Sequence, residues 1–440
     1  RPGSGEVKMS KVEIEQRSDK AGSADMIVAD VCGRAVQEYL GACRNVTRQY
    51  RRSLFGVAAV AFGVVALMLA TGFVEWIFWA TREGTIQNGL GHVHVMRDGY
   101  LSEGQADPFK YLVDEASPAV QQIAAMPGLK TMAPRLAFNG MISHDDNTLS
   151  FVGEGVAPDA ERVLSRAMVV AEGEPLSTVQ ADGIMLGRGL AENLGVGVGD
   201  LVVLLANTPT GGINAVEASV VGLFSTVSKA YDDSAARLPL ALAQKLLKVS
   251  GVHRWILVLE DTENTASVTA ALRQTYADSG LAFVPWYEMA DFYTKLVSLL
   301  SRQMGVVVII IGVIIVLSIS NMMMMNVLER TAEIGTCMAI GRTRRQILRQ
   351  FVFEGLTIGL TGAALGLLVG ALGALGISYV GIPMPPPPGM SESYRGEILL
   401  TAPIALQALS VAMGTTLLAS LYPAWKASRL QIVDALRHNR

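Results

Sequence analysis

Four long apolar runs dominate the 440-residue chain and restrict its possible folds more than any other feature. A helix that crosses the hydrocarbon core of a bilayer needs about 20 consecutive, mostly apolar residues. Runs of this length occupy residues 54–80, 306–328, 356–380 and 399–422, and the second contains no charged residue. Only 17% of all residues are charged, against about 25% in soluble globular proteins. The sequence therefore predicts a membrane protein with four transmembrane helices.

Basic residues gather before the first run, between the second and third, and after the fourth. They include Arg44, Arg48, Arg51 and Arg52; Arg330, Arg342, Arg344, Arg345 and Arg349; and Lys426, Arg429, Arg437 and Arg440. Because cytoplasmic loops are enriched in Lys and Arg, these three segments are predicted to be cytosolic. In the outer block 81–300, 25 Asp and Glu outnumber 15 Lys and Arg. No basic patch with interleaved aromatic residues occurs, so we expect no nucleic-acid partner.

This topology divides the chain into nine segments. They are a cytosolic N-terminal segment, 1–43, in which Met9 is a candidate start; an entry helix and first transmembrane helix, 44–80; an extracytoplasmic domain, 81–300; the second transmembrane helix, 301–328; a cytosolic coupling helix, 329–349; the third transmembrane helix, 350–380; an outer loop with a proline run, 381–398; the fourth transmembrane helix, 399–423; and a cytosolic C-terminus, 424–440.

The outer block has the pattern of a folded α+β domain. Short alternating or apolar runs predict strands, and glycine and Asx residues separate them. The predicted strands are 92–96, 183–186, 201–205, 218–224 and 255–260, and the predicted helices are 116–126 and 264–278. A block of about 200 residues can bury a core without metals or disulfides.

Motifs that would make the chain an enzyme are absent from the sequence. It contains no GxxxxGK[ST] phosphate-binding loop, no GxSxG elbow and no HExxH metal motif. His92 and His94 alternate on a predicted strand, but no third ligand accompanies them, so a structural role is favoured over a metal site. The methionines 322–325 point in different directions on a helix, so packing is favoured over copper binding. No catalytic residue and no metal site is predicted.

The third apolar run repeats small residues at helical spacing. Gly355, Gly359, Gly362, Gly366 and Gly370 would share one face of a helix. Such a face lets two membrane helices approach closely. We expect it to pack against another helix of this chain or of a partner subunit.

The cytosolic segment 329–347 contains acidic residues and glycines that an ordinary basic loop would not need. The positive-inside rule accounts for its arginines, but not for Glu329, Glu333, Gly335 and Gly341. The pattern predicts a short helix, a break at Gly341 and a second, basic helix that enters the third span. Such an element can dock into a groove of a cytosolic partner. The candidate coupling residues are Glu329, Arg330, Glu333, Ile334, Gly335, Gly341, Arg344 and Arg345.

This segment, continued through 353–356, resembles the signature of the FtsX/MacB-type permease family, in which ER-x-x-EIG-x-x-x-A-x-G precedes basic residues and an apolar helix. Residues 422–437 resemble the family's closing motif, except that Ile432 and Val433 replace its usual residues. Residues 44–52 resemble the family's entry helix, and 183–200 an element of its outer domain. Residues 91–100 look like the LolC/LolE lipoprotein-releasing branch.

The resemblance implies the permease subunit of an ABC transporter in a bacterial inner membrane, with its large domain in the periplasm. It implies a cytosolic ABC ATPase dimer that carries ATP and Mg²⁺, a second permease copy or a paralogue, and contact with membrane lipid. The substrate would be a lipoprotein or another lipidic or peptidic ligand, with a possible periplasmic carrier or adaptor. Ligand entry would lie near Phe73, Glu75, Trp76 and Trp79. The loop that would correspond to a carrier-recruiting hook, 208–214, is short.

Two related functions and one unrelated function stay open at this point. A MacB-like peptide or antibiotic exporter would share the fold and use an adaptor. An FtsX-like mechanotransmission regulator of cell-wall hydrolases would carry a smaller outer domain. A membrane-anchored sensor or enzyme would need a catalytic constellation, which the sequence does not show.

Overall fold

The computed structural model describes residues 50–87, 89–104, 106–165, 168–226, 228–384 and 394–431. The predictions for segment 1–43, for most of the entry helix and the proline run, and for the last nine residues lie outside these ranges. The chain divides into two compact units. The helical unit comprises the described parts of Arg1–Glu75, Leu300–Val380 and Glu397–Arg440. The sheet unit comprises the described parts of Trp76–Leu299 and Gly381–Gly396.

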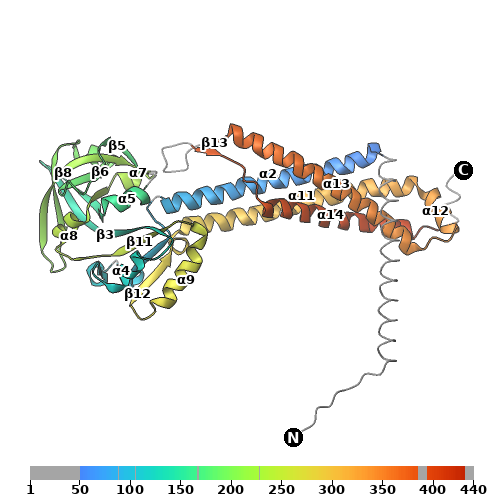
Figure 1. The fold of residues 1–440 in the computed structure, drawn as a ribbon. Helices are drawn as coiled ribbons and strands as arrows, with labels where there is room; N and C mark the ends of the chain where they lie inside the picture. The colour runs from blue at the N-terminus through green and yellow to red at the C-terminus, as the bar shows by residue number, and fades with distance from the viewer. Residues whose placement is uncertain are drawn as a thin grey trace, which may run out of the picture. The chain divides into compact units, whose positions relative to one another are not determined.

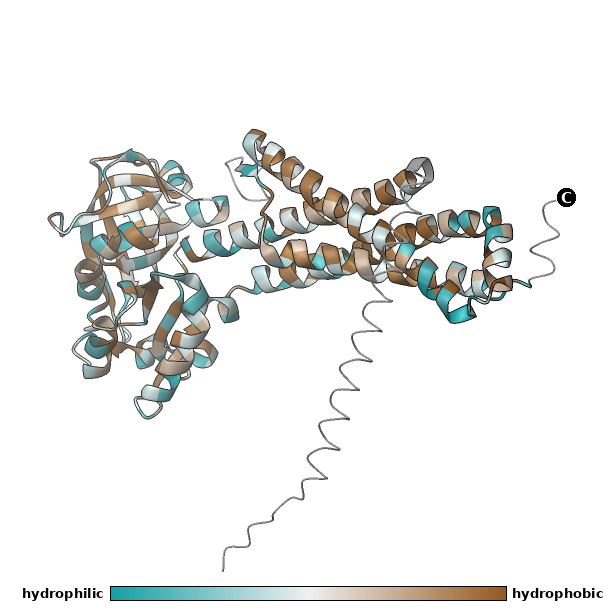
Figure 2. Ribbon diagram, turned by 45° about the vertical axis from the view of Figure 1, so that its right-hand side comes forward, coloured by the Kyte–Doolittle hydropathy of each residue, from teal (hydrophilic) through white to brown (hydrophobic). Residues whose placement is uncertain are grey.

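Four helices in the described residues are long and apolar enough to cross a membrane, as predicted (Figure 1). They are α2 (Tyr50–Gln87), α11 (Asp291–Glu329), α13 (Arg344–Val380) and α14 (Ala402–Ser428). Hydrophobic residues run along all four (Figure 2). Each helix continues beyond its apolar run at one end or both and includes residues that flank the run. Pro403 lies in the first turn of α14, where its missing N–H leaves no hydrogen bond unmade.

Small residues bring the four helices together in the helical unit. A β-carbon at Gly63 of α2 would lie 2.6 Å from Ile315 Cδ1 of α11. The Ser320 hydroxyl of α11 donates to the carbonyl of Ala419 on α14 at 2.8 Å. Helix α13 packs against both α14 and α2. The short helix α12 (Thr331–Ala339) joins α11 to α13.

The sheet unit is built on a ten-stranded sheet. Its strands are β1 (Val93–Arg97), β3 (Leu129–His144), β4 (Asn147–Val156), β5 (Val169–Gly173), β6 (Gly183–Gly187), β7 (Leu201–Asn207), β8 (Ile213–Ser225), β9 (Ala235–Pro239), β11 (Arg254–Leu259) and β12 (Leu281–Pro285). Their order is β12-β1-β11-β3-β4-β9-β6-β8-β5, and β7 pairs with both β3 and β8. Six strands, β3, β4, β9, β6, β8 and β7, therefore close into a ring.

Short elements surround and complete this sheet. The helices are α3 (Tyr100–Glu103), α4 (Pro118–Ala124), α5 (Pro158–Leu164), α6 (Arg188–Leu194), α7 (Lys229–Asp232), α8 (Leu240–Leu247), α9 (Thr265–Thr275), α10 (Trp286–Met289) and the 3-10 turns η1 (Pro108–Tyr111) and η2 (Thr262–Asn264). Two small strand pairs stand apart from it: β2 (Val113–Asp114) with β10 (Gly251–Val252), and β13 (Ile382–Met384) with β14 (Tyr394–Gly396).

The interior of the strand ring is apolar. Alternation along β3 and β4 sends Leu136, Phe138 and Phe151 into a buried cluster with residues of β6, β7, β8 and α8. The rings of Phe138 and Phe151 meet edge to face, 5.8 Å between centroids. The opposite face of the same strands carries Arg135 and Glu154, outside this ring.

The structure confirms the fold class predicted from the sequence. Each predicted strand of the outer block overlaps an observed one, namely β1, β6, β7, β8 or β11. The two predicted helices overlap α4 and α9. The longest strand, β3, and its hairpin partner β4 are not among the predictions. Pro134, Asn139 and Gly140 interrupt the alternation of β3, so its pattern does not stand out in the sequence.

Candidate coupling site

The helix α12 has defined ends, and both its termination and the start of α13 follow from the sequence. Gly341 takes φ of 106°, and the next N–H, of Arg342, donates to the Cys337 carbonyl at 3.0 Å. This is the Schellman arrangement, and it requires a residue without a β-carbon at the positive φ. At the start of α13, the Thr343 N–H donates to Gln346 Oε1 at 2.9 Å, and the Gln346 N–H donates back to Thr343 Oγ1 at 3.4 Å. This reciprocal pair is a capping box.

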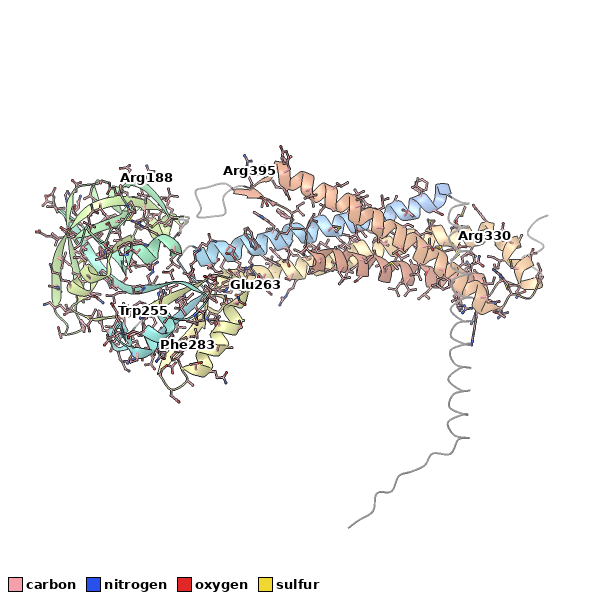
Figure 3. The ribbon with its side chains drawn as sticks, viewed as in Figure 1. Arg188, Trp255, Glu263, Phe283, Arg330 and Arg395 are labelled. Atoms are coloured by element: carbon pink, nitrogen blue, oxygen red, sulfur yellow. The ribbon has the colours of Figure 1, made fainter. Side chains whose placement is uncertain are left out.

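Arg330 lies between α11 and α12 and joins this α11–α12 junction to α13. Its Nη1 lies 2.9 Å from Oε1 of Glu354, a carboxylate that is 3% exposed, and its Nε lies 3.1 Å from Glu333 Oε2. Arg330 lies at the α12 end of the helical unit (Figure 3). Its guanidinium also lies over the Phe351 ring, 5.7 Å from the centroid. Burial alone would lower the pKa of Arg330, but Glu354 and then Glu333 raise it above its ordinary value. The α11–α12 junction and α13 are therefore tied by a partly buried ion pair.

The predicted coupling residues divide by exposure. Exposed to solvent are Glu329, Glu333, Gly341, Arg344 and Arg345. Buried against the rest of the helical unit are Ile334 and Gly335. Beside the exposed group stands Ile340, an apolar side chain that is 82% exposed. An exposed isoleucine among arginines gives this end a mixed apolar and basic surface of the kind that protein partners contact.

The small-residue face of α13 contacts two helices in succession. Its first half meets α14: a β-carbon at Gly355 would lie 2.6 Å from Ser420 Cβ, and one at Gly359 would lie 2.8 Å from Thr416 Cγ2. Its second half meets α2. β-Carbons at Gly362, Gly366 and Gly370 would lie 2.7 Å from Val60 Cβ, 2.7 Å from Val64 Cβ and 2.9 Å from Met68 Sδ, respectively. Packing of this face within the chain accounts for all five glycines.

The four residues predicted to lie near a ligand occupy the part of α2 that spans both compact units. Trp76 is 6% exposed and Trp79 is 49% exposed. Glu75 is exposed and Phe73 is half-buried. The structure holds no ligand that would assign them a role, so their contact with substrate stays a prediction.

The two histidines of strand β1 and the turn before it have protein partners. His92 Nδ1 accepts the N–H of Leu259 at 3.1 Å, and His94 Nε2 lies 2.5 Å from the Leu90 carbonyl oxygen. Burial lowers the pKa of His94 to about 3. In the part of the chain that the structure describes, no three His, Cys, Asp or Glu side chains cluster in a way that could hold a metal ion.

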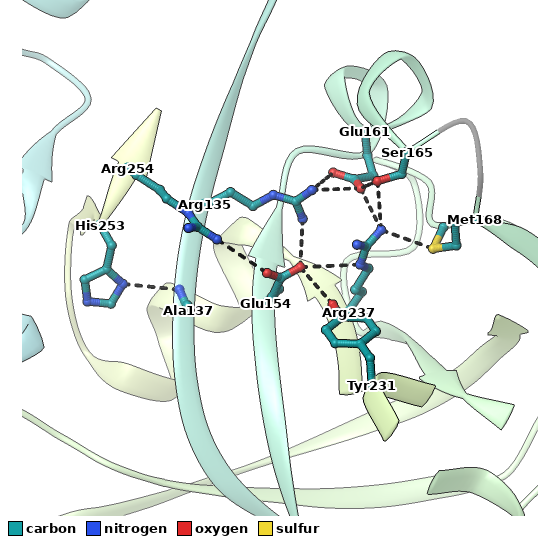
Figure 4. Close-up of polar contacts among 10 residues, drawn as sticks. All are labelled: Arg135, Ala137, Glu154, Glu161, Ser165, Met168, Tyr231, Arg237, His253 and Arg254. Carbon is teal, nitrogen blue, oxygen red and sulfur yellow. Dashed lines mark hydrogen bonds and ion pairs between the residues drawn. The ribbon is translucent and has the colours of Figure 1, made fainter. Parts of the chain in front are cut away.

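A buried charge cluster on the outer face of the strand ring was not predicted from the sequence (Figure 4). Arg135 Nη1 lies 3.1 Å from Glu154 Oε2, and its Nη2 lies 2.9 Å from the Glu161 carboxylate. Arg237 Nη1 lies 2.7 Å from Glu161 Oε1, and the Tyr231 hydroxyl donates to Glu154 Oε2 at 3.1 Å. Burial alone would raise the pKa of Glu154, but the neighbouring guanidinium groups, Arg135 first, lower it to about 2.

Two family models match this chain. Residues 53–275 match the MacB-like periplasmic core domain, and residues 305–432 match the FtsX-like permease C-terminal region. The first match covers the first long helix and most of the sheet unit, and the second covers the rest of the helical unit with α12 and the Arg330–Glu354 pair.

Curated relatives agree with these matches. The lipoprotein-releasing system transmembrane protein LolC of Neisseria meningitidis is 24% identical over 418 residues, which cover 88% of this chain and 94% of LolC. LolE of Haemophilus influenzae is 24% identical and covers 70% of this chain and 78% of LolE. The macrolide export protein MacB of Syntrophobacter fumaroxidans is 34% identical over 34% of this chain and 19% of MacB. The chain thus belongs to the family of ABC transporter permeases that carry a MacB-like periplasmic core domain and an FtsX-like C-terminal region.

Proposed function

We propose that this permease couples ATP hydrolysis on a cytosolic ATPase dimer to movement of its periplasmic domain, and so extracts a lipoprotein or another lipidic ligand from the outer leaflet of the inner membrane. The observation that carries the coupling is the ion pair of Arg330 with Glu354, 2.9 Å long, which ties α12 to both adjoining long helices. A docking element must be held rigidly to the helices that it moves, and a partly buried ion pair supplies such a tie because removal of one partner leaves the other charge unpaired.

The exposed side chains of the element are suited to the docking step. Glu333 is 63% exposed at its side chain, and Arg344 and Arg345 stand exposed where α13 begins. Ile340 supplies the apolar centre of this surface. When the ATPase pair closes on ATP, displacement of α12 would pass through Arg330 into α11 and α13. ATP and Mg²⁺ would be held by the partner chains.

The lipidic substrate is supported by the extent of the relatives' alignments. LolC is matched along 94% of its length, whereas MacB is matched along 19%. Trp76 and Trp79 of α2 are proposed to lie beside the entering ligand. A second permease copy or a paralogue would complete the pair, and a periplasmic carrier or adaptor would accept the product.

The test is a pull-down of the tagged full chain in mild detergent, with mass spectrometry of co-purifying proteins and lipidated peptides. A P-loop ATPase together with triacylated lipoprotein is the expected result. An ATPase with a periplasmic adaptor and no lipoprotein would favour peptide or antibiotic export, and an ATPase with a cell-wall hydrolase would favour mechanotransmission. Absence of an ATPase would overturn the coupling assignment.

The coupling step is tested separately with Glu333→Lys, which reverses the charge of one side chain on the docking surface and removes its contact with Arg330. We expect ATP-driven release in nanodiscs to fall at least about tenfold, the equivalent of 1.4 kcal/mol. Membrane insertion should be unchanged, because Glu333 is exposed. Glu217→Lys makes the same charge change on exposed β8 of the sheet unit and should keep full activity. Equal release by both variants would contradict the proposal.

A further inference from the structure

The buried charge cluster borders a cavity of about 410 Å³ in the sheet unit. Its lining includes Arg135, Glu154, Tyr231, Arg237 and Arg254, with Leu90 and Met168 as apolar walls. Small-ligand pockets have volumes of about 300–1,000 Å³. The cavity therefore has the size of a binding site rather than of a packing defect.

Positive charge exceeds negative charge among the groups at this cavity. Three guanidinium groups, of Arg135, Arg237 and Arg254, face two carboxylates, of Glu154 and Glu161. Glu154 lies within 3.1–3.8 Å of all three arginines, so it cannot neutralise each of them. Nearby Asp232 does not line the cavity, and its carboxylate accepts from Ser225 and Thr226.

Hydrogen-bond donors of the cluster are also left unused. Arg237 is 5% exposed, and its Nε has no hydrogen-bond acceptor among the described residues; Glu154 Oε2 is 3.5 Å away. Arg254 reaches Glu154 only at 3.8 Å. A buried donor without an acceptor is destabilising, so an anion that accepted from these groups would be stabilised.

The cluster has an open side at a glycine. Gly89 takes φ of 99°, and a β-carbon there would lie 3.8 Å from Arg135 Nη2, 3.9 Å from Ser165 Oγ and 4.0 Å from Arg237 Nη2. Two guanidinium nitrogens and a hydroxyl therefore converge beside a residue that has no side chain, and of these Arg135 Nη2 and Ser165 Oγ already donate to Glu161. Planar guanidinium groups bind carboxylate and phosphate oxygens through paired N–H donors.

We propose that this cavity is a binding site for a single oxyanion group, a carboxylate or a phosphate, held by Arg237 and Arg254, which both line it. The proposal goes beyond the coupling function and does not depend on it. The anion would supply the acceptor that Arg237 Nε lacks and would balance the third guanidinium. The walls formed by Leu90 and Met168 leave room for an apolar substituent on the ligand. The same chemistry is available from a free anion and from a phospholipid headgroup.

The experiment titrates the full chain in neutral detergent with inorganic phosphate and with acetate, at constant ionic strength kept with sodium chloride, by calorimetry and thermal shift. Wild type should bind one of these probes saturably. Arg254→Gln should weaken binding by at least about tenfold, because it removes a charge-assisted hydrogen bond to the anion. Arg254→Lys, which keeps the charge but loses the paired N–H donors, should bind more weakly than wild type and more tightly than Arg254→Gln.

Arg188→Gln is the matched control, since it removes an exposed arginine of the same unit that pairs with the exposed Glu192. It should bind like wild type. Arg254 is partly exposed, and among the described residues its side chain has one ion pair, the 3.8 Å contact to Glu154. Its variants are therefore expected to fold, which size-exclusion profiles check. No saturable effect of either probe beyond chloride, or an Arg254→Gln variant that binds like wild type, would overturn the proposal.

A last arm separates the two sources of the oxyanion. In nanodiscs of phosphatidylglycerol, a site filled by a headgroup should show weaker apparent phosphate binding than in nanodiscs of phosphatidylcholine. A site for a free anion should bind phosphate equally in both. Either result supports the site, and the difference identifies its ligand.

Discussion

Each of the two compact units of this permease is stabilised internally by a different kind of interaction. The sheet unit buries large apolar side chains such as Leu136, Phe138 and Phe151 inside its strand ring. In the helical unit, the helices instead pack closely at glycines, and Thr416 of α14 packs against Gly359 of α13. Water drives the burial of apolar surface in the first case. Between membrane helices that driving force is absent, because lipid tails are as apolar as the side chains, so close packing of small residues takes its place.

The units also differ in how they bury charge. In the helical unit, Arg330 pairs with Glu354 at the edge of the apolar segment and keeps contact with solvent through Glu333. In the sheet unit, Arg135 is 1% exposed and is enclosed by carboxylates. A buried pair contributes little net stability, but removal of one partner is costly because the other charge stays buried. The sheet unit should therefore be more sensitive than the helical unit to the loss of one charge.

The largest expected effect is that of Arg135→Gln. This substitution leaves the buried Glu161 with one guanidinium partner fewer, and we expect a loss of about 3–5 kcal/mol in the stability of the sheet unit. The measurement is hydrogen exchange of the purified full chain, which reports β3 and β4 separately from the long helices. Arg188→Gln, at an exposed pair, should cost no more than about 1 kcal/mol. Similar losses in the two variants would show that burial does not set the difference.

A smaller effect is expected from Gly366→Leu in the helical unit. A β-carbon at this position would lie 2.8 Å from the backbone oxygen of Ala61, which cannot move away as a flexible side chain would. Overpacking of this kind costs about 1–3 kcal/mol. The melting temperature of the full chain in detergent should fall, with exchange rising in α2 and α13. Gly376→Leu is the control on the same helix, because nothing lies within 4 Å of its added β-carbon. An unchanged Gly366→Leu protein would contradict the packing interpretation.

Local patterns made the long helices and several strands predictable, while contacts distant in sequence were not. The helix termination at Gly341 and the capping pair at Thr343 can be inferred from neighbouring residues alone. The Arg330–Glu354 pair spans 24 residues, and its only sequence signal is a carboxylate near the start of an apolar run. Arg237 and Glu161 are 76 residues apart on different elements. The parallel pairing of β4 with β9 brings them together, because α5 follows β4 directly, and no periodicity within one element encodes that pairing.

The last prediction uses acid to separate the units. Burial lowers the pKa of His94 from 6.5 to about 3, so between these values the unfolded chain binds a proton that the folded sheet unit does not. Stability contributed by His94 is complete above pH 6.5 and is lost as the pH falls toward 3, by at most about 1.4 kcal/mol per pH unit. His253, whose pKa burial lowers to about 4, acts in the same direction.

Exchange in β1 and β11 should therefore accelerate as the pH falls from 6.5 to 4.5, beyond the intrinsic pH dependence of exchange, while α13 should show no comparable loss of protection. His94→Asn removes the titrating group and keeps a donor for the Leu90 carbonyl, so its pH dependence should be flatter than that of wild type. Two outcomes would contradict this explanation. One is equal destabilisation of both units by acid. The other is a His94→Asn variant whose exchange depends on pH as strongly as that of wild type, because the lowered histidine pKa values would then not explain the acid sensitivity of the sheet unit.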